Sequence, residues 1–156
     1  MPVMVGLIAD THGLLRQDVA SAFAGVDLIL HAGDVGSLDV LVELREIAPV
    51  HAVRGNVDDP SDPRFDDTHH LEVEGWRLVV THGHLLRRLT PELLLRQFDA
   101  DIVVFGHTHR PLLHRHEGRM VVNPGAAGPR RFDLVPSVAR LELSAGQADV
   151  THVTLA

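Results

Sequence analysis

Five short polar clusters in this 156-residue chain each follow an apolar run, and their side chains are of the kinds that bind metal ions. The clusters are Asp10-Thr11-His12, Gly33-Asp34, Gly55-Asn56, His82-Gly83-His84 and Gly106-His107-Thr108-His109. Carboxylate, amide and imidazole groups suit divalent transition-metal ions, and two ions that share a carboxylate need about seven such donors. The clusters supply that number, so they predict a centre for two metal ions.

The donors divide into two sets around a shared carboxylate. We expect Asp10, His12 and His109 to hold one ion, Asn56, His82 and His107 to hold the second, and Asp34 to lie between them. No cluster is specific by itself, because Asp-x-His and Gly-Asp occur by chance and a single histidine is more often a structural residue. The prediction rests on the presence of all five clusters in this order.

The apolar runs before the clusters indicate buried strands at residues 3–9, 28–31, 50–53, 77–81 and 102–105. Helical patterns occur at residues 16–23, 38–47 and 91–98. Strands that alternate with helices pair in parallel, and ligands then gather at the carboxyl ends of the strands. The sequence therefore predicts that the five clusters meet at one edge.

The end of the chain has a different pattern. Short strands are expected at residues 112–116, 119–122, 137–143 and 150–155, without helices between them, which predicts an antiparallel meander. Glu74-Gly75 suits a hairpin turn between two earlier strands, and residues 58–67 read as a loop. Together the two halves predict one α/β domain, residues 1–156, in which two sheets pack face to face with helices outside.

Composition narrows the class of protein. The formal charge is −7, with 21 acidic residues against 14 basic ones, all of them arginine, which disfavours binding to nucleic acid or to anionic membranes. There is no cysteine, so a thiolate metal site is excluded. No apolar run approaches the roughly 18 residues of a membrane span, and the start of the chain lacks a positive leader. We expect a soluble cytoplasmic protein.

The order Asp-x-His, Gly-Asp, Gly-Asn, His-Gly-His, Gly-His-x-His resembles that of the calcineurin-like metallophosphoesterases, from about Leu7 to Gly125. The stretches Gly55-Asn56-Val57-Asp58 and Asn123-Pro124-Gly125 are most similar to those of the small bacterial and archaeal phosphodiesterases of that superfamily. The resemblance implies a four-layer αββα sandwich of two mixed β-sheets.

The resemblance also implies chemistry. It matches the ligand sets given above, with Asp34 as the bridging carboxylate, and implies in-line attack on a small phosphate ester by a hydroxide that bridges two ions. Manganese is the first choice of metal, while iron, zinc, nickel or cobalt also suit these donors. Asp34, Asn56 and His84 are the residues expected to act in catalysis. A homodimer is consistent with the resemblance.

Two positions depart from the family pattern. Val57 stands where many members carry a histidine that protonates the leaving group, which favours diesters with good leaving groups or requires help from His84. His84 is equally suited to a supporting hydrogen bond. Ala126 stands where serine is expected. Arg54, Arg130 and Arg131 lie close to the clusters and are candidates for binding substrate phosphate.

Two other functions share this pattern. A phosphoesterase fold can serve as a non-catalytic scaffold or binding module, although such a change is usually accompanied by lost ligands, and none is lost here. A nuclease is the other alternative, and the net negative charge with few aromatic residues argues against it.

Overall fold

The computed structural model describes residues 2–131 and 133–156, whose strands form two five-stranded sheets. The first sheet has the order β10-β9-β1-β2-β3 and the second the order β4-β5-β6-β8-β7. The strands are β1 (Val3–Ile8), β2 (Leu28–His31), β3 (Val50–Ala52), β4 (Thr68–Val73), β5 (Trp76–Thr81), β6 (Ile102–Val104), β7 (Leu112–His116), β8 (Arg119–Asn123), β9 (Ser137–Ser144) and β10 (Gln147–Thr154). Both sheets mix parallel and antiparallel pairs.

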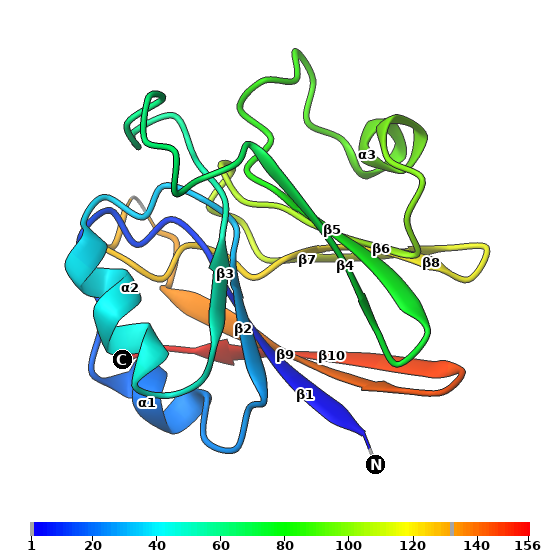
Figure 1. Ribbon diagram of the computed structural model, residues 1–156, viewed down its shortest axis with the longest axis horizontal. Coiled ribbons are helices and arrows are strands. Elements are labelled where there is room, and N and C mark those ends of the chain that lie inside the picture. Colours follow the sequence, from blue (N-terminus) through cyan, green and yellow to red (C-terminus); the bar gives the residue numbers. More distant parts are fainter. Residues whose placement is uncertain (1, 132) are drawn as a thin grey trace.

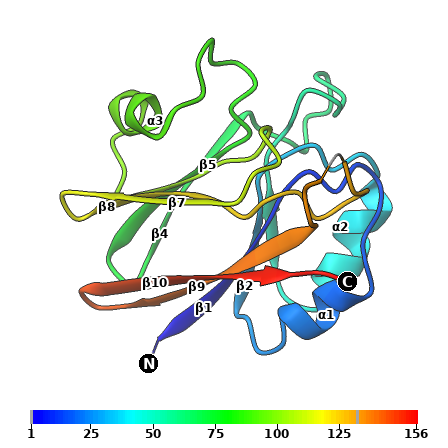
Figure 2. The ribbon, with the colours of Figure 1, turned by 180° about the vertical axis from the view of Figure 1, so that it is seen from behind.

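Within the described part of the chain, three short helices cover the outer faces of the sheets. Helices α1 (Asp18–Ala22) and α2 (Leu38–Arg45) lie against the first sheet, and α3 (Pro91–Gln97) lies against the second (Figures 1 and 2). Apolar side chains fill three layers: between the sheets, under α1 and α2, and under α3. The expected four-layer αββα sandwich is therefore confirmed.

The alternation of side chains along buried strands produces this layering. In β1, Val5 and Leu7 point into the core between the sheets, while Ile8 points toward α1 and α2. In β5, Val80 points into the same central core and Val79 packs under α3. Both faces of these strands are covered, which explains why they read as continuous apolar runs in the sequence.

The helices are shorter than the sequence patterns predicted. Two of them start at side-chain caps: Ser37 accepts a hydrogen bond from the Asp39 amide, and Thr90 accepts one from the Leu93 amide. Helix α1 spans only Asp18–Ala22, and its N-cap makes no such side-chain bond.

The expected terminal meander is wrong. Strands β7 and β8 form an antiparallel hairpin in the second sheet, but β9 and β10 form a hairpin in the first sheet, where β9 pairs with β1. The chain crosses between the sheets after β8, because the apolar residues of β9 complete the core beside β1.

The parallel pairs set the position of the polar loops. Strands β1, β2 and β3 run parallel in the first sheet, and β5 and β6 run parallel in the second. In each sheet, the loops that follow these parallel strands therefore leave from the same end of the sheet. No helix among the described residues is long and apolar enough to cross a membrane.

Candidate metal centre

The predicted ligands all lie in loops that follow these parallel strands. Asp10 and His12 follow β1, Asp34 follows β2, Asn56 follows β3, His82 and His84 follow β5, and His107 and His109 follow β6. The structure brings all of these loops together, as the sequence predicted for the strand ends.

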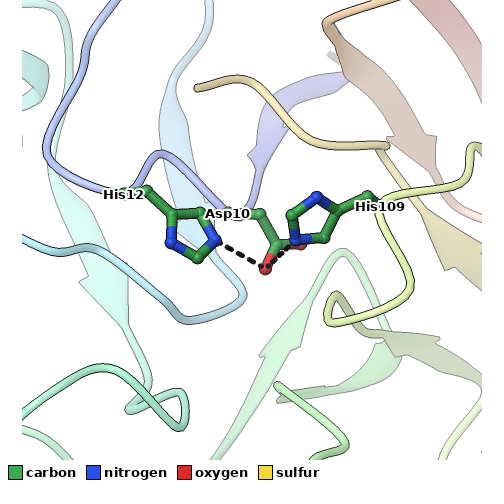
Figure 3. Close-up of side chains that lie close together, drawn as sticks. All are labelled: Asp10, His12 and His109. Atoms are coloured by element: carbon green, nitrogen blue, oxygen red, sulfur yellow. Dashed lines mark ion pairs between the residues drawn. The ribbon is translucent and has the colours of Figure 1, made fainter. Parts of the chain in front are cut away.

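Asp10 lies at the middle of the first group. Its Oδ1 atom is 3.5 Å from Nε2 of His109 and 3.9 Å from Nε2 of His12, and both rings point toward it (Figure 3). Its other oxygen accepts a hydrogen bond from the His107 amide. The expected set of Asp10, His12 and His109 is thus present with ligand atoms facing one another.

The second group surrounds His82. Nε2 of His82 is 3.1 Å from Oδ1 of Asn56 and 3.3 Å from Nδ1 of His107. Oδ2 of Asp34 is 3.3 Å from this Nε2 and 3.5 Å from Nε2 of His12, so Asp34 lies between the two groups. Asp10 Oδ1 is also 3.8 Å from His82 Nε2, so Asp10 faces both groups as well.

The donor atoms fit a cation. Within residues 2–131 and 133–156, the buried atoms Asp10 Oδ1 and His12 Nε2 have no hydrogen-bond partner. The oxygen of the Asn56 amide also faces acceptor atoms of Asp34 and His107, to which it cannot donate. Buried polar atoms are rarely left unpaired, and ions bound among these atoms would satisfy them.

The backbone of the ligand loops is strained. Among the described residues, seven that are not glycine have positive φ. Two of these, Glu74 and Glu117, precede a glycine in a hairpin turn. The other five are predicted metal ligands: Asp10, His12, Asp34, His107 and His109. Such conformations persist where surrounding contacts enforce them, and they concentrate at functional sites.

Hydrogen bonds from buried or partly buried groups hold the predicted ligands in place. His82 Nδ1 donates to the Ala32 carbonyl at 2.8 Å, which orients the ring so that Nε2 faces Asp10 and Asp34. The Asp58 carboxylate accepts the amides of Val35, Gly36 and Gly55, and so joins the Asp34 and Asn56 loops.

Asn123 supports the last cluster in the same way. Its Nδ2 atom donates to the Gly106 carbonyl and to Thr108 Oγ1, and its Oδ1 accepts the Gly125 amide. Asn123 and Asp58 belong to the motifs that carry the family resemblance, but no role could be predicted for them from the sequence. Both residues lie close in sequence to predicted ligands, which could have marked them as supporting residues. Only the hydrogen bonds show what they support.

The pKa values of the two acidic residues of the centre, Asp10 and Asp34, are shifted in opposite directions. Burial raises the pKa of Asp10 to about 7. Burial acts in the same direction on Asp34, but hydrogen bonds from His82 and the Val57 amide outweigh it and lower the pKa of Asp34 to about 2. A divalent ion beside Asp10 would offset the cost of burying its charge.

The histidine ligands are mostly neutral. Burial lowers the pKa of His12 and His107, and it lowers the pKa of His109 to about 4. Burial also opposes the charge of His82, but the hydrogen bond and charge of Asp34 outweigh it and raise its pKa. A neutral imidazole has a free lone pair, which metal binding requires.

A fully buried histidine outside the centre, His31, predicts sensitivity to acid. Burial lowers its pKa from 6.5 to about 4, so the unfolded chain takes up this proton first. Its contribution to stability is complete above pH 6.5 and is lost as the pH falls to 4, by up to about 3 kcal/mol. Because Asp10 and other groups also titrate in this range, the loss is measured as the difference between wild type and His31→Gln in urea unfolding of metal-free protein at pH 7 and pH 4.5. His31→Gln should lose less than wild type, and equal losses would contradict the assignment.

The other predicted site residues lie in different surroundings. The His84 ring is 5.3 Å from the His82 ring, and its buried Nδ1 has no hydrogen-bond partner among the described residues. Arg131 is exposed, and its charge opposes the rise in the pKa of Asp10 and adds to the lowering of the pKa of His109, so it lies near the first group. Arg130 is exposed as well.

Arg54 is held by the loop that follows it. Its guanidinium donates to the carbonyl groups of Pro60, Asp62 and Phe65. It also lies 3.8 Å from the Asp67 carboxylate. These contacts occupy the group that was expected to bind phosphate, so the structure gives Arg54 the task of fixing residues 58–67 instead.

Comparison with known proteins agrees with this geometry. A family model for the calcineurin-like phosphoesterase superfamily domain matches residues 3–146. A probable metallophosphoesterase of Methanothermobacter thermautotrophicus is 35% identical over 156 residues, which cover 94% of this chain and 90% of that protein. A phosphodiesterase of Methanocaldococcus jannaschii is 27% identical over 139 residues, which cover 78% of this chain and 82% of that protein.

A solved structure shows the same fold. Wild-type Vps29 from Entamoeba histolytica, complexed with Zn²⁺, superimposes with a TM-score of 0.81 at 24% sequence identity. The match covers 97% of this chain and 99% of that one.

Proposed function

This chain belongs to the calcineurin-like phosphoesterase superfamily, and we propose that it is a phosphodiesterase with a two-ion metal centre. The observation that carries the proposal is the convergence of all seven expected donors, with Asp34 between a histidine of each group. Two divalent ions bound there would activate a water molecule for in-line attack on phosphorus and hold the phosphate oxygens. The phosphodiesterase from M. jannaschii supports the choice of reaction.

The residues of the centre would have separate roles in binding metal and substrate. Asp10, His12 and His109 would hold one ion, and Asn56, His82 and His107 the other, with Asp34 shared. His84, whose ring lies 5.3 Å from that of His82, would assist catalysis either at the leaving group or by supporting the second group of ligands. We propose Arg131 as the cation that meets substrate phosphate, because its charge already acts on the first group.

The identity of Val57 supports diesters over monoesters. Its half-exposed side chain follows Asn56 and offers no proton to a leaving group. Substrates whose leaving group is a weak base are therefore favoured, because they depart without a general acid. We propose small phosphodiesters of this kind as substrates and Mn²⁺ as the preferred ion.

Hydrolysis of bis-p-nitrophenyl phosphate tests the proposal. Protein stripped by a chelator should be inactive and should recover on addition of Mn²⁺, and the diester should be cleaved faster than p-nitrophenyl phosphate. Activity that survives chelation would contradict the metal centre, while faster cleavage of the monoester would contradict only the substrate class. Absence of turnover with every divalent ion would favour a scaffold, and efficient cleavage of single-stranded oligonucleotides would favour a nuclease.

A further inference from the structure

His31 is a fully buried polar side chain at the end of β2, and it is not part of the clusters of possible metal ligands found among the described residues. Both of its ring nitrogens are engaged. Nδ1 accepts the Gly33 amide at 3.2 Å, and Nε2 lies 3.0 Å from Oγ1 of Thr11. His31 therefore links the loop that carries Asp34 to the loop that carries Asp10 and His12.

The direction of these hydrogen bonds follows from their partners. The Gly33 amide can only donate, so Nδ1 of His31 carries no proton, and a neutral ring then carries its proton on Nε2. This proton is donated to Thr11 Oγ1, whose own hydroxyl donates to the Val35 carbonyl at 2.8 Å. The chain runs in one direction, from Gly33 through His31 and Thr11 to Val35, and every member is satisfied.

The two loops that this chain joins carry three strained ligands. The amides of Asp10, His12 and Gly13 donate to the carbonyls of Gly33, Asp34 and Val35, at 3.0, 3.0 and 2.8 Å. Asp10, His12 and Asp34 have positive φ, which side chains other than glycine rarely adopt. The backbone bonds set the spacing of the loops, and the buried side chains of His31 and Thr11 add a second link between them.

We infer that His31 and Thr11 form a positioning pair that holds Asp10, His12 and Asp34 in the geometry that binds metal. The inference rests on the proposed function, since it concerns the affinity of the same centre. Neither residue binds an ion in this account. Groups that orient metal ligands typically change metal affinity about 10- to 100-fold when they are removed.

Titration calorimetry with Mn²⁺ at pH 7 tests the pair. Thr11→Val keeps the shape of the side chain but removes the acceptor for His31 and the donor to Val35, so we expect affinity to fall about 10- to 100-fold. Thr11→Ser keeps the hydroxyl and should stay within about 3-fold of wild type. His31→Gln keeps a donor but cannot serve both partners, and it should weaken binding as Thr11→Val does.

A core variant separates positioning from general destabilisation. Leu143 is fully buried in β9, in the core between the sheets. Leu143→Ala should lower the melting temperature without changing the affinity for Mn²⁺. Wild-type affinity in Thr11→Val and His31→Gln, or an equal loss in Leu143→Ala, would overturn the inference. Failure of the wild-type protein to bind Mn²⁺ would instead contradict the proposed function, and the inference with it.

Discussion

Asp34→Ala is expected to reduce hydrolysis of bis-p-nitrophenyl phosphate by at least about 1,000-fold, the largest effect of any single side chain here. Asp34 Oδ2 lies within 3.5 Å of a histidine from each ligand group. Its other oxygen accepts the Val57 amide, which fixes the carboxylate between the groups. Without it, two ions lose their shared ligand and their mutual repulsion is no longer offset. Initial rates at saturating Mn²⁺ measure the loss.

Asp99→Ala is the matched control for this variant. Asp99 is 94% exposed, lies in the loop between α3 and β6, and pairs only with the exposed side chain of Arg77 in the described part of the chain. Removal of its charge should leave the rate unchanged. Retention of more than a tenth of wild-type activity in Asp34→Ala would contradict the role of Asp34 as the shared ligand.

Gly36→Ala is expected to destabilise the protein by at least about 3 kcal/mol, because it combines backbone strain with overlap of backbone atoms. Gly36 has φ +85°, and a Cβ there would overlap the Gly13 amide nitrogen and lie 2.6 Å from the carbonyl carbon of His12. Relief of this overlap requires the loop of Asp10 and His12 to move away from the loop of Asp34. Metal affinity should fall together with stability.

Gly75→Ala isolates the contribution of backbone strain. Gly75 has φ +84°, nearly the same as Gly36, but a Cβ there meets nothing within 4 Å. Its substitution should cost only about 1–2 kcal/mol and should leave Mn²⁺ affinity unchanged. Equal losses of stability in the two variants, measured by urea unfolding, would show that overlap with the His12 loop contributes nothing.

The apolar runs predicted the strands before the site well. Strands β2 and β7 have the predicted bounds, and β1 and β6 end one residue earlier than expected. Strands β1, β2 and β6 are largely buried, so their sequences are mostly apolar and easy to recognise, whereas β7 is largely exposed. The helix ends were predicted less well: α1 and α2 end one and two residues earlier than expected, because the ends of helices fray.

The pairing of the final strands could not be predicted from local pattern. Strands β9 and β10 have the alternation of any hairpin, and nothing in that pattern says which sheet they join. Their place beside β1 depends on contacts between residues far apart in the chain, such as Val5 with Leu141.

The arginines illustrate a second limit. Arg54, Arg119 and Arg140 each donate to two or more backbone carbonyls of neighbouring loops, and Arg16 donates to the carbonyls of Gly128 and Ala156. A planar guanidinium suits such a task as well as it suits phosphate. Position in the sequence near a ligand cannot distinguish the two uses, which is why Arg54 was expected at the substrate.

The supporting hydrogen bonds were also beyond the sequence. His31 and Asp58 are polar residues close to ligands in the chain, and either could have been a ligand itself. Only the structure shows that His31 is buried against Thr11 and that Asp58 binds backbone amides. The predicted ligands could be singled out because seven suitable donors in this order seldom arise by chance, and the structure brings their side chains together.

Anomalous diffraction from crystals grown with Mn²⁺ locates the bound ions themselves. The two-ion centre predicts two manganese peaks about 3.5–4 Å apart, one beside Asp10, His12 and His109 and the other beside Asn56, His82 and His107, with Asp34 between them. A single manganese ion bound away from Asp34, or no peak at these side chains, would contradict it.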